Sequence, residues 1–184
     1  MTRKPPEQLA EGDLYLRRWQ ASDAGALEAA ASSSIAELSP WMPWAAKGYS
    51  MTDAQQFLEL TIQSWEVGDE YDYAIVVDGK PSGSFGLMRP LCERPDTFEI
   101  GYWLATKVTG RGWATRATAM LIKVARELGA KHVQIRHAEL NVRSSKIPST
   151  LGFTCTGTHF MEVSRRSQEK AQCVVWELAL TQQT

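Results

Sequence analysis

The segment that most constrains the fold of this chain runs over residues 99–115, with the sequence EIGYWLATKVTGRGWAT. This pattern is typical of a strand, a short glycine turn and the first turn of a helix. Gly110 and Gly112 flank Arg111, and residues without a Cβ let the backbone approach a bound group closely. The first turn of the following helix offers unpaired N–H groups and the positive end of the helix dipole at the same place. We therefore expect this turn to hold an anion such as a phosphate or pyrophosphate.

Two common phosphate-binding motifs do not fit this turn. A P-loop requires Gly-Lys followed by Ser or Thr, whereas Trp113 follows Gly112 here. A dinucleotide-binding fingerprint requires a third glycine or an alanine at the position of Thr115, and an acidic residue at the end of the next strand. An ordinary glycine turn without a ligand is the alternative that the loop alone leaves open.

The turn resembles the acetyl-coenzyme A pyrophosphate loop of the GNAT acetyltransferase superfamily. In that family the loop usually starts with Arg or Gln three residues before the first glycine. Lys107 has that position here, so the positive charge is kept but the planar guanidinium fork is absent.

Further motifs resemble the RimJ/RimL branch of that superfamily, the ribosomal-protein N-terminal acetyltransferases. Residues 14–19 (LYLRRW) resemble its opening strand, and residues 41–44 (WMPW) resemble its tryptophan-containing segment. Residues 141–144 (NVRS), followed by Leu-Gly-Phe at 151–153, resemble its second signature. The resemblance extends over residues 13–180, with the motifs in the family's order.

The composition is typical of a compact enzyme. With 184 residues, 43% of them apolar, and seven tryptophans, the chain can bury a sizeable core. We expect residues 13–184 to form a single domain and residues 1–12, which are polar and contain prolines, to be a flexible N-terminal arm. A net charge of −1 favours neither nucleic acid nor an anionic membrane. No apolar run is long enough to cross a bilayer.

The cysteine and histidine patterns argue against disulfides and a metal site. Cys92, Cys155 and Cys173 form neither an even set nor a Cys-x-x-Cys spacing, which is typical of reduced thiols in the cytoplasm. His132 and His137 are five residues apart on an expected strand and would face opposite ways. We therefore expect no metal.

Hydrophobic periodicity and turn residues predict a mixture of helices and strands. The dipeptide Asp78-Gly79 between two apolar runs predicts a hairpin. Ser22 or Asp23 would cap a helix that runs to about Leu38, and Thr52 or Asp53 would cap a helix that runs to about Val67. Further helices are predicted over 114–128 and 143–151. Strands are predicted over 14–19, 71–77, 81–88, 97–104, 131–138, 153–163 and 173–180. The strand at 131–138 should run parallel to the strand at 97–104, because a helical crossover joins them.

This order predicts an α/β (α+β) fold, and the resemblance implies its details. The GNAT fold has a mixed central sheet, here of six to seven strands, flanked by helices. Acetyl-CoA would lie in the cleft between two splayed parallel strands, which end near Leu104 and Ala138. The backbone of Trp103, Leu104 and Ala105 would pair with the amides of the pantetheine arm. The residues assigned to the cofactor are Trp103, Leu104, Ala105, Lys107, Val108, Thr109, Gly110, Arg111, Gly112, Trp113, Ala114, Thr115, Asn141 and Lys146.

The catalytic assignments also come from the resemblance. Many GNAT enzymes protonate the departing thiolate with a tyrosine that follows the asparagine, but no tyrosine follows Asn141 in this chain. A serine at the position of Ser144 is the candidate donor in the RimL-like branch; the alternative is that Ser144 only caps a short helix. Glu99 lies on the strand beside the site and could accept the amine proton through water, or could be a surface carboxylate. Glu139 is a weaker candidate.

The acceptor is expected to be an amine of low pKa. An α-amine with a pKa of about 8 is about one-tenth neutral at pH 7, whereas a lysine at about 10.4 is neutral in only a few parts in ten thousand. A site without a strong base therefore suits an amine of low pKa: a peptide N-terminus, an amino sugar or a similar small amine. The resemblance to the RimJ/RimL branch implies the first of these. Trp41, Trp44 and Tyr102 are candidates for the acceptor wall, and a place in the core is the alternative for Trp41.

Two other functions remain open at this stage. The chain could acetylate a small-molecule amine such as an antibiotic, toxin or metabolite, or it could be a non-catalytic acyl-CoA-binding sensor. The expected partner is the amine acceptor, and a homodimer formed through the closing hairpin is a further option.

Overall fold

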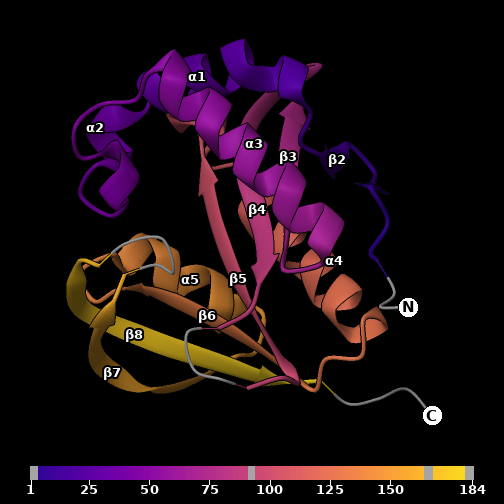
Figure 1. Cartoon of the computed structure of the whole chain (residues 1–184). Helices are drawn as coiled ribbons and strands as arrows, with labels where there is room; N and C mark the ends of the chain where they lie inside the picture. The colour runs from indigo at the N-terminus through magenta and orange to yellow at the C-terminus, as the bar shows by residue number, and fades with distance from the viewer. Residues whose placement is uncertain (1–3, 91–93, 164–167, 181–184) are drawn as a thin grey trace.

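A computed structural model describes residues 4–90, 94–163 and 168–180, and a single mixed sheet organises them (Figure 1). Its eight strands have the order β1-β2-β3-β4-β5-β6-β8-β7. Neighbouring strands are antiparallel except β5 and β6, which are parallel. The strands are β1 (Gln8–Glu11), β2 (Leu14–Arg18), β3 (Glu70–Val77), β4 (Lys80–Met88), β5 (Thr97–Leu104), β6 (His132–Ala138), β7 (Thr154–Glu162) and β8 (Lys170–Ala179).

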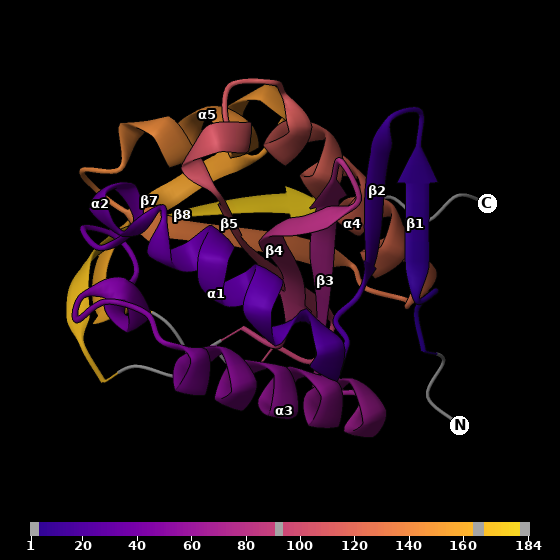
Figure 2. The ribbon, with the colours of Figure 1, turned by 90° about the horizontal axis from the view of Figure 1, so that it is seen from above.

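Helices cover both faces of the sheet (Figure 2). One face carries α1 and α3, and the other carries α4 and α5. Large side chains such as Trp19, Trp65, Tyr73 and Phe85 are fully buried between these layers. The helices are α1 (Ala24–Ser32), α2 (Ile35–Leu38), α3 (Met51–Val67), α4 (Trp113–Glu127) and α5 (Val142–Thr150), with 3-10 turns η1 (Ala21–Asp23), η2 (Pro43–Ala45) and η3 (Thr106–Val108).

The β3–β4 hairpin confirms the turn predicted from Asp-Gly. Asp78 and Gly79 have φ angles of 50° and 76°, as a two-residue turn with left-handed central residues requires. The parallel pairing of β5 with β6 and the helix between them are also as predicted.

The predicted helix over 23–38 is wrong as one element, because it is interrupted at two serines. The Ser33 hydroxyl donates to the Ala29 carbonyl at 2.7 Å, and the Ser34 hydroxyl donates to the Ala30 carbonyl at 2.8 Å. Serine hydroxyls in this position compete with the backbone for helical carbonyl groups and favour a break. The chain therefore forms α1 and the short α2.

The flexible arm expected over residues 1–12 is wrong for Gln8–Glu11, which pairs antiparallel with β2 as β1. Gly12 has a φ of +63° and lets the chain reverse there. Arg116 of α4 then holds the turn, since it donates to the Glu11 carbonyl at 2.6 Å and to Asp13 at 2.7 Å. This edge strand brings the sheet to eight strands rather than the expected six to seven.

The structure also describes two of the three cysteines and the apolar character of the helices. Cys155 is exposed and Cys173 is buried, both as free thiols, whereas Cys92 lies outside the described residues. In the described part of the chain, no helix is both long and apolar enough to span a membrane.

Candidate functional site

The parallel strands β5 and β6 separate shortly after they meet, as Figure 1 shows. Their pairing covers only Thr97 to Glu99 on β5. Beyond that point β5 continues beside β4 as far as Leu104, and β6 continues beside β8 as far as Ala138. Among the residues that the structure describes, the facing edges of the two strands therefore have no ladder partner there, which is the arrangement needed to admit an extended, amide-bearing ligand.

The strand register decides which backbone groups of β5 face this separation. The Ala105 N–H donates to the Ser82 carbonyl at 2.8 Å, and the Ala105 carbonyl accepts from Val108 N at 3.0 Å. Alternate residues of an antiparallel strand bond to the same neighbour, so the backbone of Trp103 also faces β4. A Cβ added at Gly83 of β4 would clash with the Trp103 carbonyl oxygen, which agrees with this direction.

The groups directed toward β6 are therefore those of Tyr102 and Leu104. The backbone groups of Trp103 and Ala105 face β4 and η3 in this register, so of the three residues expected to pair with a ligand it is Leu104 that faces β6. The expectation for Leu104 is compatible with the register.

The glycine turn between η3 and α4 has an open surface. Gly110 and Gly112 have φ angles of 81° and 74°, which favour glycine in the left-handed region. A Cβ at either position would meet no atom within 4 Å. The glycines are thus required by the backbone conformation, and the turn leaves free space on its outer side.

The amides of this turn form a donor cluster. In the residues that the structure describes, no backbone or side-chain acceptor takes a hydrogen bond from the N–H groups of residues 110–115. The first bond of α4 is from Arg116 N to the Gly112 carbonyl, at 3.2 Å. Gly112 is the N-cap and supplies no side-chain cap. Unpaired amides at a helix N-terminus are suited to an anion.

Positive side chains border these amides. Arg111 and Lys107 are exposed, and within the described residues neither forms an ion pair. The Arg111 guanidinium lies 5.1 Å from the Trp113 ring centroid, in cation–π geometry. Free amides and unpaired cations together fit a pyrophosphate.

A second cluster lies on the face that α4 and α5 cover. The Tyr102 hydroxyl of β5 lies 3.1 Å from the Ser144 Oγ of α5. Asn141 is the N-cap of α5, and its Oδ1 accepts from Ser144 N at 3.2 Å. The structure thus joins three residues for which the sequence predicted separate roles, and it places Tyr102 beside Ser144 rather than beside Trp41 or Trp44.

Glu99 is buried and ion-paired, which sequence reasoning did not anticipate. Arg136 of β6 donates to both carboxylate oxygens, at 2.8 and 2.9 Å, and also donates to the Glu162 carbonyl at 2.7 Å. Gln134 Nε2 lies 3.4 Å from Glu99 Oε2. Because side chains alternate along a strand, Glu99 and Trp103 point to the face opposite Tyr102.

Aromatic side chains gather on that opposite face. Trp44 of η2 has its ring centroid 5.5 Å from that of Trp103 and 5.2 Å from that of Tyr49. Trp44 is 39% exposed, whereas Trp103 is buried. Tyr49 was not predicted, and its place in a polar loop offered no signal for it. Trp41 is half-buried outside this group.

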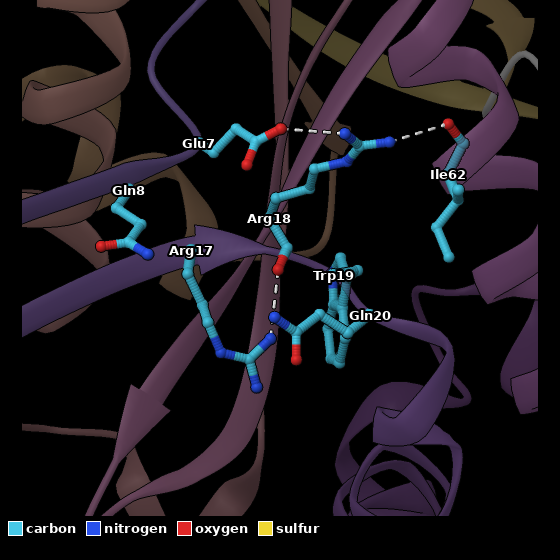
Figure 3. A pocket seen from close by; sticks show the side chains of 7 residues that line it. All are labelled: Glu7, Gln8, Arg17, Arg18, Trp19, Gln20 and Ile62. Carbon is cyan, nitrogen blue, oxygen red and sulfur yellow. Dashed lines mark hydrogen bonds and ion pairs between the residues drawn. The ribbon is translucent and has the colours of Figure 1, made fainter.

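A separate cavity of about 260 Å³ lies between the β1–β2 edge and α3. Figure 3 shows its arginines held by hydrogen bonds. Arg17 forms a bidentate pair with Asp23 at 2.7 and 2.8 Å, and Arg18 bonds to Glu7 and Glu66. Both guanidinium groups are thus already paired with carboxylates. Its lining residues are Glu7, Gln8, Arg17, Arg18, Trp19, Gln20 and Ile62.

Comparisons with known proteins agree with this geometry. Residues 13–154 match the family model described as an acetyltransferase (GNAT) domain. Comparison with functionally curated protein sequences gives no significant match.

Solved structures share the fold. A RimL ribosomal L7/L12 α-N-protein acetyltransferase in complex with coenzyme A has a TM-score of 0.81 at 18% identity, over 95% of this chain and 98% of that one. The microcin C7 self-immunity acetyltransferase MccE with acetyl-CoA and AMP has a TM-score of 0.81 at 19% identity, over 92% and 94%. Mycobacterium smegmatis RimJ, with a CoA disulfide, has a TM-score of 0.77 at 20% identity, over 90% and 81%.

The splayed strands and the turn of free amides, together with the family match, define an acetyl-CoA-dependent acyltransferase. The chain belongs to the GNAT acetyltransferase family, whose model matches most of its length. Its exposed turn amides and the free edge of β5 fit acetyl-CoA as the cosubstrate, in agreement with similar folds that hold CoA and acetyl-CoA.

Proposed function

We propose that this enzyme transfers the acetyl group of acetyl-CoA to a protein N-terminal α-amine by direct attack. The observation that carries the proposal is the ion pair between Glu99 and Arg136. A carboxylate that already accepts two charge-assisted hydrogen bonds is a poor acceptor for another proton. The Glu99 carboxylate, on β5 where the strands separate, is therefore no strong base, and an amine that is already partly neutral is the suitable nucleophile.

The pKa values of the two common protein amines give the size of this effect. The difference of about 2.4 units between a lysine and an α-amine is equivalent to about 3.3 kcal/mol. In an enzyme without a strong base, this whole difference would appear as faster acetylation of the α-amine than of the lysine side chain. The RimL structure that shares the fold is described as an α-N-protein acetyltransferase, which supports the same acceptor class.

The proposed binding roles follow the geometry. The amides of residues 110–115, with Arg111 and Lys107, hold the pyrophosphate, and Lys146 of α5 is a further cation for the phosphates. The backbone of Leu104 pairs with the pantetheine arm. The acceptor approaches from the face that carries Trp44 and Trp103.

The proposed chemistry needs three events at the thioester carbon. The neutral amine attacks this carbon, and a C–N bond forms while the carbonyl oxygen takes up negative charge. The C–S bond then breaks, and its electron pair stays on sulfur. Ser144 donates a hydrogen bond to this sulfur, and the ammonium proton passes to water or to the thiolate.

An acceptor panel tests this proposal. Purified enzyme is incubated with acetyl-CoA and one of three acceptors: a peptide with a free N-terminus, an Nα-acetylated peptide that contains lysine, or an amino sugar. Release of CoA and product mass are measured. We expect kcat/KM to be at least about 100-fold higher for the free N-terminus than for the lysine side chain, from the pKa difference above.

Other outcomes have clear meanings. Faster acetylation of lysine side chains would overturn the proposal. Turnover of the amino sugar alone would favour the small-molecule alternative, for which the MccE structure with bound AMP is the relevant similar fold.

The proposed location of this enzyme is the cytoplasm. The two free thiols that the structure describes, Cys155 and Cys173, are compatible with it.

A further inference from the structure

The Tyr102 hydroxyl connects two elements that border the site. Tyr102 is on β5 and Ser144 is on α5, 42 residues later, yet the two hydroxyl oxygens lie 3.1 Å apart. The same phenol is also 3.4 Å from the Ser144 carbonyl oxygen. The chain has no tyrosine after Asn141, so this contact brings a phenol to α5 from a different element.

Both partners are held in place by other contacts. The Tyr102 ring stacks on Phe85, with the centroids 5.6 Å apart and an interplanar angle of 22°. Phe85 is fully buried and is the direct partner of Tyr102 in the β4–β5 register. On α5, the Ser144 amide donates to both the side chain and the carbonyl of Asn141. The hydroxyl contact is therefore an arrangement built into the fold.

Either hydroxyl can be the donor in this hydrogen bond, and the Ser144 carbonyl, 3.4 Å away, can only accept from the phenol. Burial raises the pKa of Tyr102 to about 12, and the smaller effect of the hydrogen bond to Ser144 lowers it. The phenol thus keeps its proton at neutral pH and can donate it to Ser144 Oγ. When it does so, the single proton of the serine hydroxyl is free for another acceptor.

We propose that Tyr102 is a positioning residue that donates to Ser144 Oγ and directs the serine O–H toward the sulfur that departs between β5 and β6. This inference rests on the donor role of Ser144 in the proposed function. It also gives Tyr102 a role beside the departing sulfur instead of the contact with the acceptor that the sequence predicted.

Proton affinities limit what the pair does. A thiol has a pKa of about 8.5, well below that of Tyr102, so neither hydroxyl loses its proton to the thiolate in a net sense. The electron pair of the broken C–S bond stays on sulfur, Ser144 donates a hydrogen bond to it, and Tyr102 keeps Ser144 in that orientation. Both hydroxyl groups are unchanged after turnover.

The test is a double-mutant cycle with Tyr102→Phe and Ser144→Ala. The phenylalanine keeps the stack on Phe85 and removes only the hydroxyl. We expect Tyr102→Phe to lower kcat about tenfold, in the range of a lost catalytic hydrogen bond, with KM for acetyl-CoA within about twofold. Because Tyr102 acts through Ser144, the double variant should be no slower than Ser144→Ala.

Ser145→Ala is the matched control. Ser145 lies on the same helix and its hydroxyl donates to the Val142 carbonyl at 2.7 Å, away from Tyr102. Its kcat should be unchanged, and the thermal midpoints of all variants should show whether they are folded.

Three results would overturn the inference: wild-type kcat for Tyr102→Phe, a multiplicative loss in the double variant, or a loss for Tyr102→Phe without one for Ser144→Ala. The losses should be equal for every amine that is turned over. A negative result in the double-mutant cycle would therefore not affect the proposed acceptor class. If the acceptor panel shows a different preferred amine, the cycle can still be measured with that amine.

Discussion

Arg136 holds both carboxylate oxygens of Glu99, with side chains only 3% and 8% exposed. Glu99 is the last residue of β5 that pairs with β6, and Arg136 lies two residues beyond Gln134, the ladder partner of Glu99. The ion pair therefore acts as a clamp at the base of the separation. Removal of one partner would leave the other buried without its counter-charge.

We expect Arg136→Ala to lower the free energy of unfolding by about 3–5 kcal/mol, because the Glu99 carboxylate would stay buried and unpaired. The double variant Arg136→Met with Glu99→Leu should recover part of this loss, since no charge is then buried. Urea unfolding followed by tryptophan fluorescence measures both. A loss below about 1 kcal/mol for Arg136→Ala would show that the pair does not clamp the strands.

The two ends of α4 offer a matched pair of glycines. Gly112 and Gly129 have φ angles of 74° and 87°, and a Cβ at either meets nothing within 4 Å. Alanine at each should cost about 1–2 kcal/mol of stability, because an L-residue is strained there. Only Gly112→Ala should also weaken acetyl-CoA binding, about five- to tenfold, because it shifts the donor amides.

Isothermal titration with acetyl-CoA, together with thermal unfolding, checks this pair. Gly129→Ala serves as the control for stability loss without a change at the turn. Equal affinity in both variants would mean that the turn does not bind the cosubstrate.

Gly83 and Gly25 should respond to alanine in opposite ways. A Cβ at Gly83 would clash with the Trp103 carbonyl oxygen, and φ is +157° there. We expect Gly83→Ala to destabilise the protein by about 2 kcal/mol or more, since backbone would have to move. Gly25 lies in α1 with open space around it, so Gly25→Ala should stabilise by about 0.5–1 kcal/mol. Chemical denaturation measures the free energy of unfolding of both variants. A Gly83→Ala variant as stable as the wild type would contradict the β4–β5 register.

Trp44 should affect the acceptor rather than the fold. It is 39% exposed and rests on buried Trp103. We expect Trp44→Ala to raise KM for the acceptor about three- to tenfold, consistent with an aromatic contact of about 0.5–1.5 kcal/mol, with KM for acetyl-CoA unchanged. Phe160 is 67% exposed on β7, and Phe160→Ala is the control. Steady-state kinetics with each substrate varied would show no shift in acceptor KM if Trp44 lies outside the acceptor path.

Local sequence signals predicted the elements whose structure is decided within a few residues. Asp78-Gly79 defined the β3–β4 turn, and Gly68 ends α3 in a left-handed conformation. The N-terminus of α3 was less well predicted: Ser50 is the cap, and Asp53 completes the capping box from the third helical position. Ser50, Thr52 and Asp53 are all residue types that favour the N-cap position, so the hydrophobic period alone cannot show which of them begins the helix.

The residues of the candidate site were predicted unevenly. The glycine turn was recognisable because its chemistry lies in consecutive backbone amides. The partner of Glu99 was missed, because Arg136 lies 37 residues away and no short motif connects them. The pairing of Tyr102 with Ser144 was missed for the same reason.

The sequence by itself determined the order of β2 to β8 and of α3, α4 and α5, the glycine turns and the membership in a family, since these depend on local backbone preferences and on motifs along the chain. It did not predict β1 or the break between α1 and α2. Only the tertiary structure decided which groups are paired. The strand register directs the Leu104 backbone toward β6 and that of Ala105 toward β4. Packing brings Glu99 to Arg136 and Tyr102 to Ser144, because contacts across a sheet depend on register and burial, which no local pattern encodes.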